Sequence, residues 1–206
     1  MSAAKSYKSF KRCLAKRLAL EGYVGNGDRL TLKVSEAVIV FELQQDLKNS
    51  SKELVRFTVN AGISLDALRV FFSGEPSESS VSTEQCHWRS RLGRLMPPPS
   101  DVWWTINNDE EAESRCGEIV SIIRDIAFPQ IKTLAVVETF VQLWQSGRGQ
   151  GLTEYERRIS LARLLTALGR KSEAREALEA FEAASIGKAW AASAKVDARE
   201  LNKHLE

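Results

Sequence analysis

Three runs of residues with strand character follow one another between residues 29 and 63, and they constrain the fold more than any other feature of the chain. They are Arg29–Val34, which alternates apolar and polar residues, Ala37–Gln45, which is rich in Val, Ile and Phe, and Leu54–Ile63, which alternates again. Two residues separate the first pair of runs, and the polar segment Asp46–Lys52 separates the second pair. Because strands joined by such short connections pair antiparallel, the sequence predicts an antiparallel sheet.

Two further strands are predicted after this group, at Cys86–Leu92 and Val102–Ile106. Between them lies Met96–Ser100, whose three consecutive prolines cannot continue a hydrogen-bonded ladder. The segment Asp66–Phe72 fits a short helix and a strand equally well. Gly74–Thr83 is rich in Ser, Glu and Pro without periodicity, so we expect a loop there.

An amphipathic helix is predicted at the start of the chain, from Ala4 to about Leu20, because Tyr7, Phe10 and Leu14 recur at helical spacing. Its polar face carries six cations, which are Lys5, Lys8, Lys11, Arg12, Lys16 and Arg17. Together with the strands, this predicts an α+β fold in which an N-terminal helix lies on a four- or five-stranded antiparallel sheet.

From Asn108 onward the sequence has helical character. Asn108 is a favourable N-cap, and the three acidic residues that follow it suit the positive end of a helix dipole. Apolar residues recur at helical spacing up to Ile126 and again within residues 131–144. Pro129 should end or kink the helix between these two stretches.

A glycine-rich linker at residues 146–152 precedes a predicted helical hairpin. Thr153 and Glu156 have the spacing of a capping box, and a turn after Gly169 should reverse the chain. A third helix is expected from Lys188 to Leu205. We therefore expect two parts, an α+β domain at residues 1–130 and a helical extension at residues 131–206.

Residues able to support catalysis or bind a metal are few. Three Cys, at positions 13, 86 and 116, form an odd set without short spacing, unlike a disulfide scaffold or a zinc motif. Cys86 and His87 are adjacent, and neighbours in a strand point to opposite faces, so they should not hydrogen-bond. No glycine-rich phosphate loop follows a strand. We expect no catalytic residue, no bound metal and no cofactor.

Two of the predicted strands carry a cluster suited to binding, which consists of His87, Arg89, Arg91, Trp103 and Trp104. Alternation separates Trp88 from the histidine and the arginines, and it places the two later tryptophans on opposite faces. One face could therefore show arginine, histidine and one indole to a partner, where guanidinium groups on indole anchor a protein or a nucleic-acid base. In the alternative interpretation the arginines pair with nearby carboxylates and both tryptophans fill the core.

The segment from Cys86 to Leu95, CHWRSRLGRL, followed by DVWWTI at residues 101–106, resembles a bacterial family known as domain of unknown function 4304. The basic opening helix, FELQ at residues 41–44 and RFTVNAG at residues 56–62 agree with this pattern, and the resemblance covers about residues 5–130. It implies a small α+β domain with no catalytic residues to carry over. Domains of this kind are similar to those found near polymorphic toxin loci, where some serve as immunity proteins.

Residues 161–174 resemble one tetratricopeptide helix-turn-helix unit. Small Ala162 and Ala174 would let two antiparallel helices approach closely around the glycine turn. The sequence departs from that pattern at Phe181, where alanine is expected, and at the missing proline after it. Since a single repeat buries too little surface to stand alone, we expect a hairpin packed on the rest of the chain.

Three functional hypotheses follow. The first is a non-enzymatic protein–protein interaction module, such as a toxin-neutralising or accessory factor. The second is nucleic-acid binding through the six cations of the first helix, which a net charge of only +2 disfavours. The third is an enzyme with an arginine-lined pocket. No apolar run is long enough to span a membrane, and the N-terminus lacks the apolar core of a secretory signal. We therefore expect a cytoplasmic protein with no membrane contact.

Overall fold

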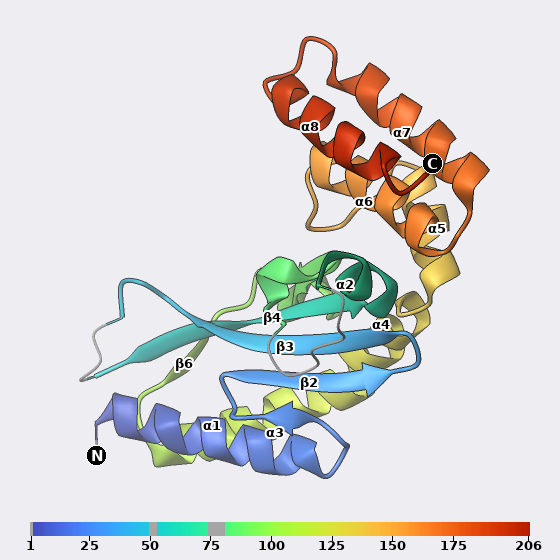
Figure 1. Cartoon of the computed structure of the whole chain (residues 1–206). Helices are drawn as coiled ribbons and strands as arrows, with labels where there is room; N and C mark the ends of the chain where they lie inside the picture. The colour runs from blue at the N-terminus through green and yellow to red at the C-terminus, as the bar shows by residue number, and fades with distance from the viewer. Residues whose placement is uncertain (1, 50–52, 74–80) are drawn as a thin grey trace.

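An antiparallel sheet with helices packed on one face is the centre of the fold, and further helices lie beyond one end of it (Figure 1). The computed structural model describes residues 2–49, 53–73 and 81–206. The architecture confirms the expected α+β class with a helical C-terminal part. Residues 74–80, most of the predicted loop at Gly74–Thr83, lie outside the described residues.

The sheet contains six strands in the described part of the chain, in the order β1-β2-β3-β4-β5, with β6 pairing with β4 beside β5. All pairs are antiparallel, as the short connections predict. The strands are β1 (Val24–Gly25), β2 (Arg29–Val34), β3 (Ala37–Gln45), β4 (Val55–Leu65), β5 (Trp88–Arg91) and β6 (Trp104–Ile106). The two-residue β1 was not predicted, because its residues lie among turn-forming glycines.

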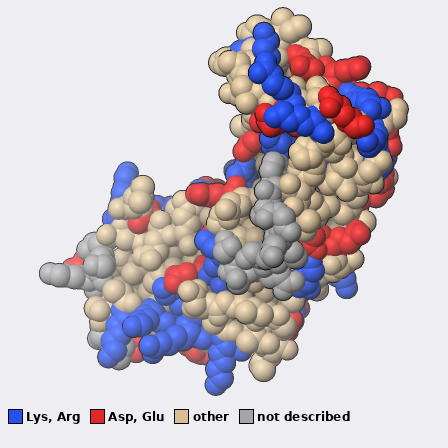
Figure 2. Space-filling model, viewed as in Figure 1, with Lys and Arg blue, Asp and Glu red and all other residues tan. Residues whose placement is uncertain are grey.

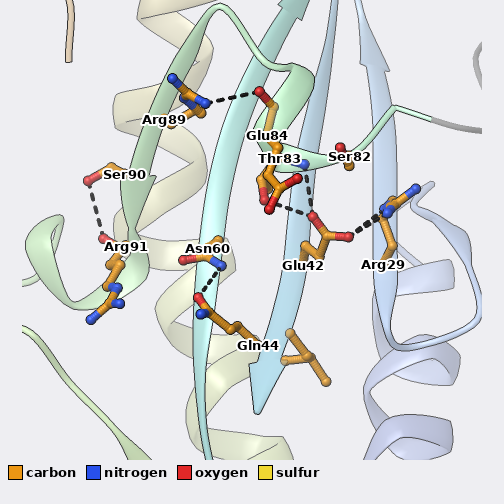
Figure 3. Close-up of a pocket in the computed structure, with 11 residues that line it drawn as sticks. Arg29, Glu42, Gln44, Asn60, Ser82, Thr83, Glu84, Arg89, Ser90 and Arg91 are labelled. Atoms are coloured by element: carbon orange, nitrogen blue, oxygen red, sulfur yellow. Dashed lines mark hydrogen bonds and ion pairs between the residues drawn. The ribbon is translucent and has the colours of Figure 1, made fainter. Parts of the chain in front are cut away.

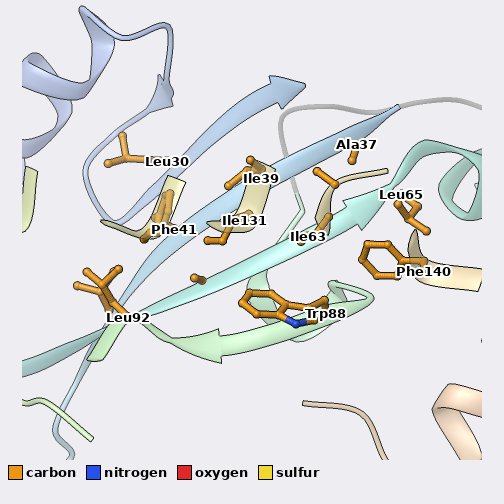
Figure 4. Close-up of a cluster of buried hydrophobic side chains, with 14 of the residues drawn as sticks. Leu30, Ala37, Ile39, Phe41, Ile63, Leu65, Trp88, Leu92, Ile131 and Phe140 are labelled. Carbon is orange, nitrogen blue, oxygen red and sulfur yellow. The ribbon is translucent and has the colours of Figure 1, made fainter. Parts of the chain in front are cut away.

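One face of the sheet forms the core against α1 (Ala3–Ala19) and α3 (Asp109–Ser121) (Figure 1). The helix α1 buries its predicted apolar stripe, including Tyr7 and Phe10, and β3 contributes Ile39 and Phe41 from alternate positions. Figure 4 shows these strand side chains together with Trp88 of β5, which is 5% exposed. Alternation therefore decides which residues of each strand enter the core.

The helices α1 and α3 are joined by a disulfide between Cys13 and Cys116, whose Cα atoms are 6.3 Å apart. The expectation that the cysteines are unlike a disulfide set was wrong for this pair. Their separation of 103 residues gives no spacing signal, and only the packing of α1 beside α3 brings them together. Cys86 remains free and buried.

After α3 the chain continues through a π-helical segment, Ile122–Ala127, into α4 (Phe128–Leu134). The prediction that residues 131–144 form one helix was wrong. The chain breaks at Ala135 and Val136, because Val136 is extended, and it restarts as α5 (Val137–Gln145). The ambiguous segment after β4 is a helix, α2 (Asp66–Ser73).

The C-terminal helices are α6 (Glu154–Ala167), α7 (Lys171–Ser185) and α8 (Ala191–Asn202). Thr153 and Glu156 form the predicted capping box. Ala162 and Ala174 are fully buried, in agreement with the close approach expected of α6 and α7. Their side chains belong to the same continuous hydrophobic cluster as the sheet core.

The glycine-rich segment before α6 lies against β5. The backbone N–H of Arg89 donates to the carbonyl oxygen of Gln150 (3.1 Å). A Cβ at Gly151 would lie 2.6 Å from Arg89 Cβ, so this close approach requires glycine. The helical region therefore packs on the sheet rather than standing apart. None of the helices within residues 2–49, 53–73 and 81–206 has the length and apolar character needed to cross a membrane.

Candidate functional site

The second face of the sheet, opposite α1 and α3, bears a polar groove of about 690 Å³ (Figure 3). We call it the polar groove, and its lining residues are Arg29, Glu42, Leu43, Gln44, Asn60, Ser82, Thr83, Glu84, Arg89, Ser90 and Arg91. Arginine, carboxylate, amide and hydroxyl groups dominate this surface. It therefore offers many hydrogen-bonding groups over an open sheet face.

Strand register creates a row of polar side chains across the groove. Arg29 of β2 lies opposite Glu42 of β3, which lies opposite Asn60 of β4, which in turn lies opposite Arg91 of β5. Arg29 Nε donates to Glu42 Oε1 (2.9 Å), and Asn60 Nδ2 donates to Gln44 Oε1 (3.0 Å). Arg29 and Glu42 are a directly opposite cross-strand pair, whereas Asn60 bonds its diagonal neighbour Gln44 and Arg91 pairs with Asp101 outside the row.

Glu42 also fixes the segment that leads into β5. Its Oε2 accepts hydrogen bonds from the backbone N–H of Thr83 (2.8 Å) and from Thr83 Oγ1 (2.7 Å). Burial raises the pKa of Glu42, but the hydrogen bonds from Thr83 and Arg29 outweigh it and hold the pKa below its usual value. The carboxylate therefore stays ionised and clamps one wall of the groove.

Arg89 joins the groove to the C-terminal helices. Its guanidinium donates to the carbonyl oxygens of Glu84 (3.0 Å) and Gly151, and it lies 3.4 Å from the Glu156 carboxylate. Burial raises the pKa of Glu156, whereas hydrogen bonds from Thr153 and the charge of Arg89 lower it, with a net decrease. These bonds fix Arg89 between β5 and α6.

Arg91 extends from the polar groove to Trp103, which precedes β6. The guanidinium carbons of Arg91 and Arg56 lie 5.1 and 4.9 Å from the Trp103 ring centroid, both within cation–π range. Each arginine is also ion-paired, Arg91 with Asp101 and Arg56 with Asp46 (3.1 Å). We call this arrangement the Arg56–Trp103–Arg91 stack. Trp103 is partly exposed within it.

The two other tryptophans of the predicted cluster region belong to the core. Trp104 is 3% exposed, stacks on Phe57 and donates its Nε1–H to Glu118 Oε1 (3.0 Å). Trp88 is buried with it. The predicted site therefore divides: Trp103, Arg89 and Arg91 lie on the second face, and Trp104 lies in the core. Consecutive residues point to opposite faces, as the alternation predicts.

His87 is not part of the polar groove lining. Its Nδ1 accepts a hydrogen bond from the backbone N–H of Leu65 (2.9 Å). Burial, aided by the charges of Arg69 and Arg89, lowers the pKa of His87 to about 4, so the ring is neutral at pH 7. Its position gives it a structural role at the end of β4.

Cys86 packs with Val38, Val40 and Val81 on the second face. Burial raises the pKa of its thiol to about 12, and Sγ lies 3.4 Å from the carbonyl oxygen of Ser82. Gly62 makes room for it, because a Cβ there would lie 2.5 Å from Sγ. A thiol in this environment is protonated and unreactive.

The six cations of α1 lie away from the polar groove, on the outer side of that helix. Lys11 pairs with Asp28 and Arg17 with Glu113. Figure 2 shows Lys and Arg side chains gathered over this helix. The other four are exposed, and no ion pair joins them to the described residues: Lys5, Lys8, Arg12 and Lys16.

Several groove residues were missed at the sequence level, notably Arg29, Glu42 and Asn60. The outward position of Arg29 was visible in its strand alternation, but its pairing required the register across three connections. Arg56 and Asp101 were missed as well, because each lies 10 residues from its ion-pair partner, Asp46 and Arg91 respectively, along a connection between two strands.

Comparison with known proteins gives one family match. Residues 14–133 match the model of the family described as Domain of unknown function (DUF4304). No curated protein and no solved structure matches the chain significantly. The matched region includes α3, the whole sheet and the C-terminal end of α1, and with them the polar groove strands. Since it covers more than half of the chain, the protein belongs to the DUF4304 family.

Proposed function

We propose that the chain is a protein-binding module that contacts its partner through the polar groove and the Arg56–Trp103–Arg91 stack. The stack carries the proposal. Trp and Arg are the residues that most often dominate the binding energy of protein interfaces. Here both types lie together on an open sheet face, next to a groove lined with hydrogen-bonding groups.

Preorganisation supports this assignment. Both arginines of the stack are ion-paired, and the Trp103 ring lies within cation–π distance of each. Side chains that are already ordered lose little conformational entropy on association, which favours affinity. The polar groove beside the stack supplies the hydrogen-bonding rim that surrounds such anchors in known interfaces.

The arrangement supports binding better than catalysis. The arginines of the groove are already held by carboxylates or by carbonyl oxygens. Arg89, for example, donates to the backbone carbonyl oxygens of Glu84 and Gly151. His87 is neutral and accepts its hydrogen bond from a strand backbone, outside the groove lining. An enzyme with an arginine-lined pocket would need an available proton-transfer group facing the same space, but the groove carboxylate Glu42 is held ionised by its bonds to Thr83 and Arg29.

Photo-crosslinking tests the proposal. A photoreactive phenylalanine analogue at Gln44, an exposed groove residue, should capture one partner in cells, whereas the same analogue at exposed Lys195 on α8 should not. With that partner purified, Trp103→Ala should weaken binding by roughly 30-fold, as expected for a hot-spot residue worth about 2 kcal/mol. Arg199→Ala is the matched surface control and should bind like the wild type.

Unchanged affinity for both Trp103→Ala and Arg91→Gln would exclude the polar groove as the binding surface. The same partner tests the narrower hypothesis suggested by the family resemblance, that the chain neutralises a toxin. In that case the partner's toxic activity should fall when the wild-type chain is added, and Trp103→Ala should protect less. A partner without toxic activity would leave an accessory binding role.

A further inference from the structure

Four exposed cations lie in one row along the outer face of α1. They are Lys5, Lys8, Arg12 and Lys16, which follow one another at intervals of three, four and four residues. Because 3.6 residues complete a helical turn, this spacing keeps all four on one side of the helix. With a rise of about 1.5 Å per residue, the row is roughly 16 Å long and its charges lie about 5–6 Å apart.

The row differs from ordinary surface charge in lacking partners. Lys11 and Arg17, on the flanks of the row, are neutralised by Asp28 and Glu113. No carboxylate of the described residues is ion-paired with the four members of the row themselves. Their positive charge is therefore available to an external anion that repeats along a line.

The surroundings of the row favour a nucleic acid over other anionic partners. A helix that binds a membrane surface inserts its apolar face, but the apolar face of α1, including Phe10 and Leu14, is buried against the sheet. Protein interfaces are depleted in lysine and need apolar anchors, whereas the exposed neighbours along the row are small residues such as Ala4 and Ser9, and the exposed Leu20 lies past its C-terminal end. A phosphodiester backbone requires neither an inserted apolar helix face nor apolar anchors.

A hollow of about 310 Å³ flanks the row between α1 and the end of β3. Lys8 and Lys11 line it together with the amide-bearing Gln45 and Asn49. Most protein–DNA hydrogen bonds go to phosphate and sugar oxygens, and lysine and amide groups are typical donors for them. The Asn49 amide is already bonded to the backbone of Arg56, so Gln45 is the amide with which the hollow extends the cationic surface.

We propose that this row binds the phosphate backbone of a nucleic acid without selecting its sequence. The site lies on α1, on the far side of the core from the polar groove, so it is independent of the function proposed above. Four neutralised phosphates should make the affinity depend steeply on salt. Between about 50 and 200 mM salt, the expected loss for duplex DNA is roughly 100-fold.

The test is a fluorescence anisotropy titration with a labelled duplex DNA of arbitrary sequence, about 20 base pairs long, at those two salt concentrations. The variant Lys5→Gln, Lys8→Gln, Arg12→Gln, Lys16→Gln should bind at least about 10-fold more weakly at low salt and lose most of the salt dependence. A second duplex of unrelated sequence should bind with the same affinity as the first.

The matched control removes four exposed cations elsewhere, with the changes Lys132→Gln, Lys188→Gln, Lys195→Gln and Arg199→Gln. It alters net charge equally and should bind DNA like the wild type. Equal weakening in both variants would overturn the proposal, because net charge alone would then explain binding. So would the absence of wild-type binding at low salt, or tighter row-dependent binding to phosphatidylserine vesicles than to DNA.

Discussion

Cys13 of α1 and Cys116 of α3 form a disulfide across 103 positions of sequence, and their Cα atoms lie 6.3 Å apart. This bond ties the cationic helix to the helix beside it. Because a cross-link closing a loop of about 100 residues restricts the unfolded chain strongly, it should stabilise the fold by about 4–5 kcal/mol in the chain-entropy description.

The first prediction concerns this bond. Urea denaturation with a strong reductant should show a lower midpoint than without it, and the variant Cys13→Ser, Cys116→Ser should show the same lower midpoint in both conditions. The remaining thiol, Cys86, is buried and serves as an internal control that should not react with a thiol reagent in the folded state. If the urea midpoint of the wild type is the same with and without reductant, the prediction is contradicted.

The second prediction concerns Trp88, which is 5% exposed and packs in the core beneath β4 and β5. Replacement by alanine removes a large aromatic side chain from a close-packed interior, so Trp88→Ala should lower the free energy of unfolding by about 3–5 kcal/mol. Thermal melting followed by circular dichroism measures the loss. Trp103→Ala is the natural comparison, since Trp103 is partly exposed, and should cost clearly less.

The third prediction concerns the contact between the segment before α6 and β5. Gly151 has φ +78° and no room for a Cβ, whereas Gly147 has φ +82° with nothing within 4 Å of that position. Gly147→Ala should therefore lower the free energy of unfolding by only about 1 kcal/mol, which is the cost of placing alanine in a left-handed backbone conformation. Gly151→Ala should cost more and increase hydrogen exchange at Arg89. If the two substitutions lower the free energy of unfolding equally, the close approach of Gly151 to Arg89 does not contribute to stability.

The fourth prediction concerns pH and His87. Its pKa falls from 6.5 to about 4 on folding, so the unfolded chain binds a proton that the folded chain excludes. The neutral His87 therefore contributes to the free energy of unfolding. The contribution is fully present above about pH 6.5 and is lost as the pH falls toward 4, and it amounts to at most about 3 kcal/mol. The variant His87→Gln, which keeps an acceptor for the Leu65 N–H, should reduce the loss of stability over that interval.

The second histidine provides the control for this measurement. His204 lies against the ring of Phe71 near the end of the chain. His204→Gln should leave the wild-type pH dependence of stability between pH 6.5 and 4 in place. If both histidine variants behave like the wild type, the carboxylates alone govern the acid sensitivity and the assigned role of His87 is wrong.

Local signals in the sequence were sufficient for most of the elements. The apolar stripe of α1, the Asn108 cap, which accepts the Glu111 N–H (2.9 Å), and the Thr153–Glu156 capping box each depend on residues a few positions apart. The break at Ala135 and Val136 has no glycine or proline to mark it, so helical periodicity continued across it in the prediction. It follows from tertiary packing rather than from local propensity.

The candidate site was only partly predictable for a related reason. Alternation separated Trp103 from Trp104 and predicted one indole on the face of Arg91, and the structure shows that this indole is Trp103. The position of Arg56 and the cross-strand row of Arg29 and Glu42 depend on register, and the position of Asp101 depends on the course of the loop between β5 and β6. Register is set by the pairing of whole strands, and a shift of one residue would move every side chain to the other face.

The hydrogen bond from the Arg89 N–H to Gln150 has a consequence for solubility. In the described part of the chain β5 is the outermost strand on its side of the sheet, and an uncovered outer strand invites pairing with another molecule. The segment before α6 occupies that position within the same chain. The segment that leads into α6 thus protects this strand from pairing with another molecule.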